Sequence, residues 1–165
     1  MDVVLQELYS GFPDGVEMTR VIVRLVIAAQ FGAIIGYERE VTGKSAGLRT
    51  HMLVALASAL FVLAPLQIQM EHDGLSRVIQ GLAAGIGFIG GGAILKLSDA
   101  REVRGLTTAA GIWLTAAIGV AAGLGRIGLA LVSTLLTWII LSVIARFEVR
   151  QSVKSARARA SESAH

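Results

Sequence analysis

The 165-residue chain has no cysteine, only two prolines and few charged residues. Without cysteine it can form no disulfide, no thiolate metal site and no cysteine nucleophile. Its three histidines are scattered and match no zinc-ligand spacing. Charged residues make up 16% of the chain, whereas soluble domains carry about 25%. This shortage of charge is typical of a membrane protein.

Hydrophobic residues, in contrast, make up 54% of the chain and gather into five apolar stretches. Each stretch has about the length that a helix needs to cross a bilayer. Because lipid offers the backbone no hydrogen bonds, such segments are forced to be helical. We therefore predict an all-α integral membrane bundle of about five transmembrane helices. The predicted spans cover residues 21–37, 48–68, 78–97, 106–124 and 127–145.

The third span is rich in glycine, which lies at helical spacing on two of its faces. Small residues let neighbouring backbones approach closely, so we expect a central helix with partners on both sides. The alternative is a conduit or hinge, in which loosened backbone at residues 90–92 exposes carbonyls to an ion or water cavity. Across the chain, the glycines expected to pack helices together are Gly32, Gly36, Gly81, Gly85, Gly87, Gly91, Gly92, Gly111, Gly119 and Gly123.

Basic residues favour one side of the predicted membrane domain, residues 20–146. They gather after the first and third spans and in the tail, residues 147–165, and five spans place all three on one side. The positive-inside rule then puts the N-terminus outside and the tail in the cytoplasm, along the anionic leaflet. The outer segment, residues 1–19, suits a short interfacial helix. This topology accounts for the basic pI, so we expect no nucleic-acid partner.

Charges of both signs abut the predicted inner helix ends. We predict that they form a rim cluster that contacts an ion, a lipid headgroup or a protein partner. The alternative is ordinary interfacial charge that holds the helix ends at their depth. A ligand role for His51 is the weaker candidate. The predicted rim cluster consists of Glu38, Arg39, Arg49, Arg104, Thr107 and Thr108.

No aspartate or glutamate lies inside a predicted span, so the sequence indicates no proton relay and no carboxylate site at the midplane. Mg²⁺ binds through one or two carboxylates. The weak candidates for this role are the rim acids Glu38, Glu40, Asp99 and Glu102. No serine has an evident base, and the chain contains no phosphate-binding loop. We therefore expect no enzyme activity and no cofactor, with Mg²⁺ as the one ion to consider.

Four segments, in order, resemble the MgtC/SapB family of membrane proteins. They are Gly32-Ala33-Ile34-Ile35-Gly36-Tyr37-Glu38-Arg39-Glu40, Gly47-Leu48-Arg49-Thr50-His51, Gly85-Ile86-Gly87-Phe88-Ile89-Gly90-Gly91-Gly92 and Val103-Arg104-Gly105-Leu106-Thr107-Thr108-Ala109-Ala110. Each alone is weak, but the set covers residues 20–145 in matching order and spacing. The resemblance implies a bacterial inner-membrane protein of about five spans. Longer members add a soluble domain after the last span, where this chain has a basic tail.

The resemblance also implies a role. Members are associated with growth at low magnesium and, in some pathogens, with survival inside macrophages. We expect a regulator that acts on other membrane proteins, the ATP synthase among them. A Mg²⁺ or other cation transporter, with its pore between the subunits of a homo-oligomer, is the second hypothesis. A lipid-organising protein without a specific partner is the third.

Overall fold

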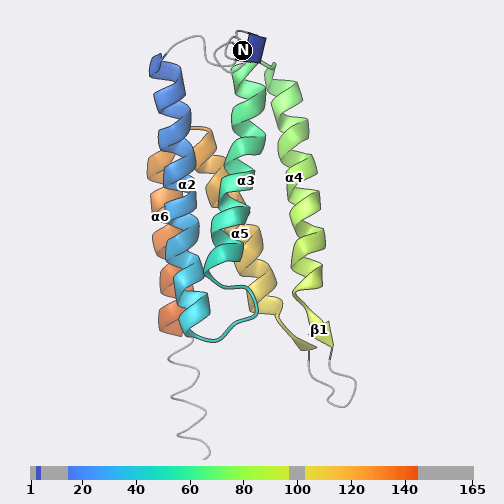
Figure 1. The fold of residues 1–165 in the computed structure, drawn as a ribbon. Helices are drawn as coiled ribbons and strands as arrows, with labels where there is room; N and C mark the ends of the chain where they lie inside the picture. The colour runs from blue at the N-terminus through green and yellow to red at the C-terminus, as the bar shows by residue number, and fades with distance from the viewer. Residues whose placement is uncertain (1–2, 5–14, 97–102, 145–165) are drawn as a thin grey trace, which may run out of the picture.

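The computed structural model describes residues 3–4, 15–96 and 103–144, and the fold within these ranges is a bundle of five helices (Figure 1). Successive helices run in opposite directions. They are α2 (Gly15–Val41), α3 (Leu48–Gln67), α4 (His72–Gly92), α5 (Leu106–Gly123) and α6 (Ile127–Ile139). A π-helical turn, Ile140–Ile144, continues α6. Between α4 and α5, strands β1 (Leu95–Lys96) and β2 (Val103–Arg104) pair antiparallel. The prediction of an all-α membrane bundle is confirmed, apart from this short ladder.

Three helices, α2, α3 and α5, are long and apolar enough to cross a membrane, and α6 is a shorter apolar helix. α4 has the length, but its glycines and Arg77 lower its mean hydropathy. The helix boundaries differ most from the prediction at α2 and α4. α2 continues past its apolar part at both ends, and α4 starts six residues early and ends at Gly92. The predicted N-terminal interfacial helix and the basic tail lie outside the described residues.

The centre of the bundle is the contact of α3 with α2 and α5. This contact is close because small residues face one another. A methyl group built on Gly32 of α2 would lie 2.5 Å from the His51 carbonyl oxygen of α3. On the other side, a methyl group on Gly119 of α5 would overlap the Ala55 carbonyl oxygen of α3. Gly36 and Gly123 approach α3 in the same way. Backbone therefore packs on backbone along most of the three-helix core.

α4 lies at the edge of the bundle, where it contacts α5 and α3 along one side (Figure 1). The expectation of a central glycine-rich helix is therefore wrong for the single chain. A methyl group added to any of five glycines of α4 would meet nothing within 4 Å. The other two glycines of α4 have neighbours, because Gly90 faces Ala109 of α5 and Gly74 lies against the side chain of Met70. The five glycines that pack against nothing in the described residues are Gly81, Gly85, Gly87, Gly91 and Gly92.

The two classes of glycine predict opposite effects of the same substitution. Gly119→Ala forces α5 away from α3 and is expected to cost about 1–3 kcal/mol of unfolding free energy. Gly85→Ala adds a methyl group in open space and gains up to about 1 kcal/mol of helix propensity. Thermal unfolding of the purified variants in detergent, followed by circular dichroism, measures both. A Gly119→Ala variant as stable as the parent would contradict the close packing.

Candidate functional site

The connection between α2 and α3 folds back on the end of α2 and fixes the residues around it. Gly43, with φ of 68°, follows the end of α2 in the left-handed conformation. The Lys44 N–H donates to the Arg39 carbonyl, and the Gly43 N–H donates to the Glu40 carbonyl. This pair of bonds is the Schellman motif, which satisfies carbonyls that a helix end leaves free. The glycine-lysine pair therefore serves as a helix stop.

A buried charge cluster lies where this end of α2 meets α3. It consists of Glu38, Arg39 and His51, whose exposed fractions are 8%, 2% and 0%. Arg39 Nη1 and Glu38 Oε2 are 3.4 Å apart and form an ion pair. Because arginine stays charged in proteins, the adjacent carboxylate offsets a charge that burial would otherwise penalise strongly. Sequence reasoning placed these side chains at an exposed rim, and the structure places them inside the bundle.

His51 occupies the centre of the helix contacts. Its Nδ1 lies 2.9 Å from the Gly47 carbonyl oxygen, in the first turn of α3. Its Nε2 faces α5, where a methyl group on Gly111 would lie 3.6 Å away. Within the described part of the chain, neither His51 Nε2 nor Arg39 Nε has a hydrogen-bond partner. Most buried polar atoms in native proteins have a partner, so these two atoms stand out within the cluster. Sequence reasoning treated His51 only as a weaker candidate ligand and did not predict its burial between the helices.

The remaining rim residues do not join this cluster. Glu40 and Arg49 are exposed, and Glu40 accepts a 2.7 Å hydrogen bond from the Leu48 N–H at the start of α3. Thr107 is exposed, whereas Thr108 is buried in the first turn of α5. The backbone of Arg104 pairs with Leu95 in the β1–β2 ladder, at the same end of the bundle. The predicted six-residue cluster is thus divided among separate positions at this end.

Two of the four candidate magnesium ligands, Glu38 and Glu40, lie in the described part of the chain, and each has a partner within the protein. Glu38 is paired with Arg39, and the exposed Glu40 is bonded to the backbone of Leu48. Asp99 and Glu102 lie outside the described residues. Among the described residues, no three acids, histidines or cysteines lie close enough together to hold a metal ion. The remaining donors therefore do not define a metal centre.

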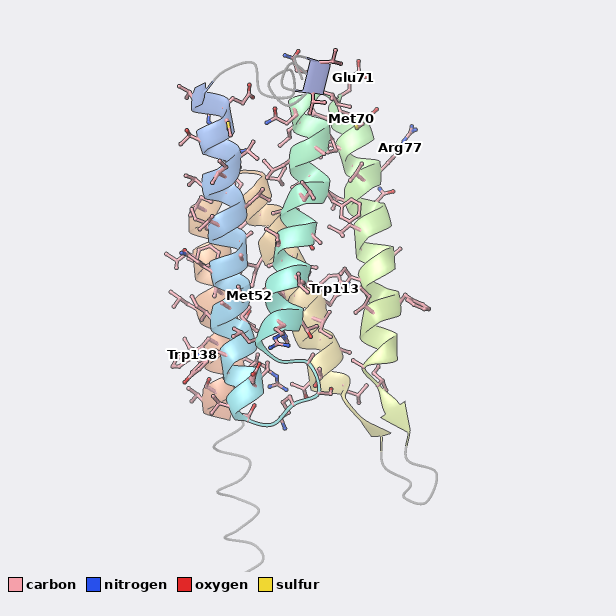
Figure 2. The ribbon with its side chains drawn as sticks, in the orientation of Figure 1. Met52, Met70, Glu71, Arg77, Trp113 and Trp138 are labelled. Carbon is pink, nitrogen blue, oxygen red and sulfur yellow. The ribbon has the colours of Figure 1, made fainter. Side chains whose placement is uncertain are left out.

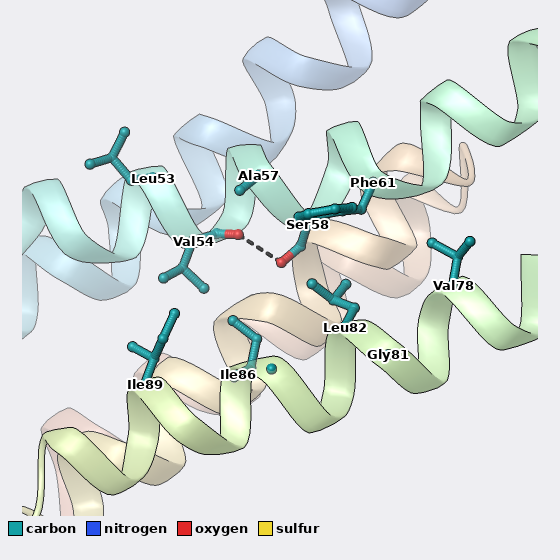
Figure 3. Close-up of a pocket in the computed structure, with 11 residues that line it drawn as sticks. Leu53, Val54, Ala57, Ser58, Phe61, Val78, Gly81, Leu82, Ile86 and Ile89 are labelled. Carbon is teal, nitrogen blue, oxygen red and sulfur yellow. Dashed lines mark hydrogen bonds between the residues drawn. The ribbon is translucent and has the colours of Figure 1, made fainter.

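An apolar groove runs between α3 and α4 and holds a volume of about 660 Å³ (Figure 3). Ser58 is its one polar side chain, and the hydroxyl donates a 2.7 Å hydrogen bond to the Val54 carbonyl of the same helix. The groove is wide because Gly81 and Gly85 carry no side chain into it. Sequence analysis found these glycines and expected both faces of their helix to have partners, but it did not predict a groove beside α3. The lining residues are Leu53, Val54, Ala57, Ser58, Phe61, Val78, Gly81, Leu82, Gly85, Ile86 and Ile89.

Several known proteins are similar to this chain over most of its length. The model of the MgtC family matches residues 25–150. Protein SrpB of Synechococcus elongatus is 45% identical over 136 residues, which cover 76% of this chain and 75% of SrpB. The protein named "Putative magnesium transporter YhiD" of Escherichia coli K12 is 40% identical over 136 residues, 78% of this chain and 62% of YhiD. Protein MgtC of Salmonella typhimurium is 41% identical over 115 residues, 70% of this chain and 48% of MgtC. No solved structure matches the chain.

The buried ion pair predicts a non-additive response to mutation. Glu38→Gln leaves the Arg39 charge buried without a counter-charge and is expected to cost about 3–5 kcal/mol of unfolding free energy. Adding Arg39→Gln removes that charge, so the double variant should be more stable than Glu38→Gln alone. Denaturation of both in detergent tests this order, with the exposed Glu40→Gln as the matched acid control. If Glu38→Gln is as stable as Glu40→Gln, the Glu38–Arg39 ion pair does not contribute to the stability of the fold.

Proposed function

The chain belongs to the MgtC family, and on this premise we propose that it is a regulator of other membrane proteins in magnesium homeostasis. The partner would dock on the exposed side of α4, beside the α3–α4 groove. The shared family supports the link to magnesium through the name that YhiD carries. The ATP synthase, which translocates protons through membrane subunits, is the partner we propose first.

The observation that carries this proposal is the open glycine surface of α4. Between helices in lipid, association is driven by van der Waals packing, which small residues make close. Within the chain, Gly32, Gly36, Gly119 and Gly123 are already used in this way, whereas the equivalent surface of α4 is unfilled. Next to it, Phe88 is 87% exposed and can anchor a helix laid along α4. A transmembrane helix of a partner is the occupant that suits this combination of size, length and apolar character.

The alternative is a Mg²⁺ or other cation transporter formed by several copies of the chain. The name of YhiD favours it, and the open side of α4 would then contact a second copy. The described residues offer such a path little support. The one buried acid among them, Glu38, is paired with an arginine. We therefore rank the regulator first.

We also propose that the protein lies in the bacterial inner membrane with the buried charge cluster toward the cytoplasm. The α2–α3 connection and the β1–β2 ladder lie at one end of the bundle (Figure 1). The described chain also ends there, at residue 144. Lys44, Arg49, Lys96 and Arg104 belong to this end, and cytoplasmic loops carry an excess of such residues.

The regulator proposal predicts a loss of function from filling the groove. In inverted membrane vesicles, the parent protein should lower ATP-driven proton pumping, measured with a pH-sensitive dye. Gly85→Leu fills the α3–α4 groove and should restore pumping at unchanged abundance. Val132→Ala, on the exposed surface of α6, is the matched control and should behave as the parent. Equal pumping with and without the protein would exclude the ATP synthase as the partner.

The transporter alternative makes a separate prediction. Purified protein in liposomes that contain a Mg²⁺-sensitive dye should give no flux under a magnesium gradient if the chain is a regulator. Flux that is abolished by Gly85→Leu but retained by Val132→Ala would assign transport to an oligomer built on α4 and would overturn our ranking. A detergent melting curve of each sample shows that the protein is folded.

A further inference from the structure

A second pocket, the α2-end pocket, opens at the end of the bundle opposite the buried charge cluster. Its volume is about 260 Å³, just below the range of about 300–1,000 Å³ typical of pockets for drug-sized ligands. Successive turns of α2 supply the charged side chains of its wall. The end of α3 supplies Gln67 and apolar side chains. Its lining residues are Glu17, Arg20, Val21, Arg24, Leu63, Leu66, Gln67 and Leu124.

The charged side chains of this pocket are not neutralised by one another. Glu17, Arg20 and Arg24 share one face of α2 through spacings of three and four residues. Yet no nitrogen of either arginine lies within 4.0 Å of a Glu17 carboxylate oxygen, since the one ion pair among the described residues is Glu38–Arg39. Two cations and one anion therefore face a common space without pairing.

Arg24 is fixed at the inner edge of the pocket. Its Nη1 donates a 3.1 Å hydrogen bond to the Gly123 carbonyl, at the end of α5. The turn after α5 passes directly over the guanidinium group, because a methyl group on Gly125 would lie 2.5 Å from Arg24 Nη2. Gly125 also has a φ of 77°, a backbone conformation that favours glycine. One guanidinium bond is thus used within the protein, while the side chain still lines the pocket.

The depth of Arg24 in the membrane requires polar surroundings for its guanidinium group. Arg24 and Glu38 are 14 residues apart on α2, which corresponds to about 21 Å along the helix axis. The hydrocarbon core of a bilayer is about 30 Å thick. The two charged ends of α2 are therefore closer together than the membrane is thick. An arginine at this depth must reach toward the headgroups or draw a phosphate toward itself.

We propose that the α2-end pocket binds the headgroup of a phospholipid that carries both a phosphate and a primary ammonium group. Arg20 and Arg24 provide the donors that a phosphodiester prefers. Glu17, on the same wall, provides the acceptor for the ammonium group. The apolar walls, Val21, Leu63 and Leu66, suit the first carbons of the acyl chains. A purely anionic headgroup would leave Glu17 facing like charge, and the pocket therefore favours phosphatidylethanolamine.

Native mass spectrometry of the detergent-purified chain tests this site with three lipids of identical acyl chains. Phosphatidylethanolamine should be retained in preference to phosphatidylglycerol and phosphatidylcholine. Arg20→Gln, which changes an exposed side chain, should weaken its retention about five-fold. Glu17→Gln should remove the preference over phosphatidylglycerol. Arg77→Gln is the matched control, because Arg77 points away from the bundle on α4 (Figure 2).

Two further measurements complete the test. A competition experiment distinguishes binding of a lipid from binding of a free phosphate compound, and melting curves distinguish loss of the site from loss of folding. Glycerophosphoethanolamine and inorganic phosphate, which lack acyl chains, should fail to displace the lipid at millimolar concentration. Melting curves should show that phosphatidylethanolamine stabilises Arg20→Gln less than it stabilises the parent and Arg77→Gln. Equal retention of all three lipids by the parent would overturn the proposal. So would displacement by inorganic phosphate alone, or unchanged retention by Arg20→Gln.

Discussion

The close approach of α3 to α2 and α5 is the constraint on which the rest of the structure depends. At Gly32 and Gly119 the backbones of neighbouring helices are so near that no side chain fits between them. In a membrane, lipid is as apolar as the helix surfaces, so such contacts replace the hydrophobic effect as the source of cohesion. Their position along α3 also determines which polar groups are enclosed, since His51 lies beside Gly32 and faces Gly111.

That enclosure explains why charge is found inside a small apolar bundle. The Schellman turn at Gly43 ends α2, and Glu38 and Arg39, in the last turn of this helix, are both buried in the bundle. Each charge alone would be costly there, and together they form a pair that tolerates burial. A buried pair contributes little net stability compared with apolar residues of the same volume.

The fold class followed from composition and apolar length, because a membrane leaves a chain few alternatives. The position of each helix within the bundle could not be predicted from composition and apolar length. Glycine at four-residue spacing predicts close contact but does not say with what, and thus α4 was placed at the centre although its glycines face open space. Burial of Glu38 and Arg39 depends on how the end of α2 packs in the bundle, which local sequence does not reveal. His51 is central for the same reason, since its neighbours Gly32 and Gly111 are far from it along the chain.

The low hydropathy of α4 has a consequence for biosynthesis. During translation, a segment is transferred from the translocon to lipid when its side chains favour the hydrocarbon. α2 and α3 meet that condition by themselves, whereas α4 contains Arg77 and many glycines. In the folded bundle α4 packs mainly against α5, and α5 is synthesised only after α4. We expect α4 to stay within the insertion machinery until α5 emerges and the two leave as a helical hairpin, joined by the β1–β2 ladder.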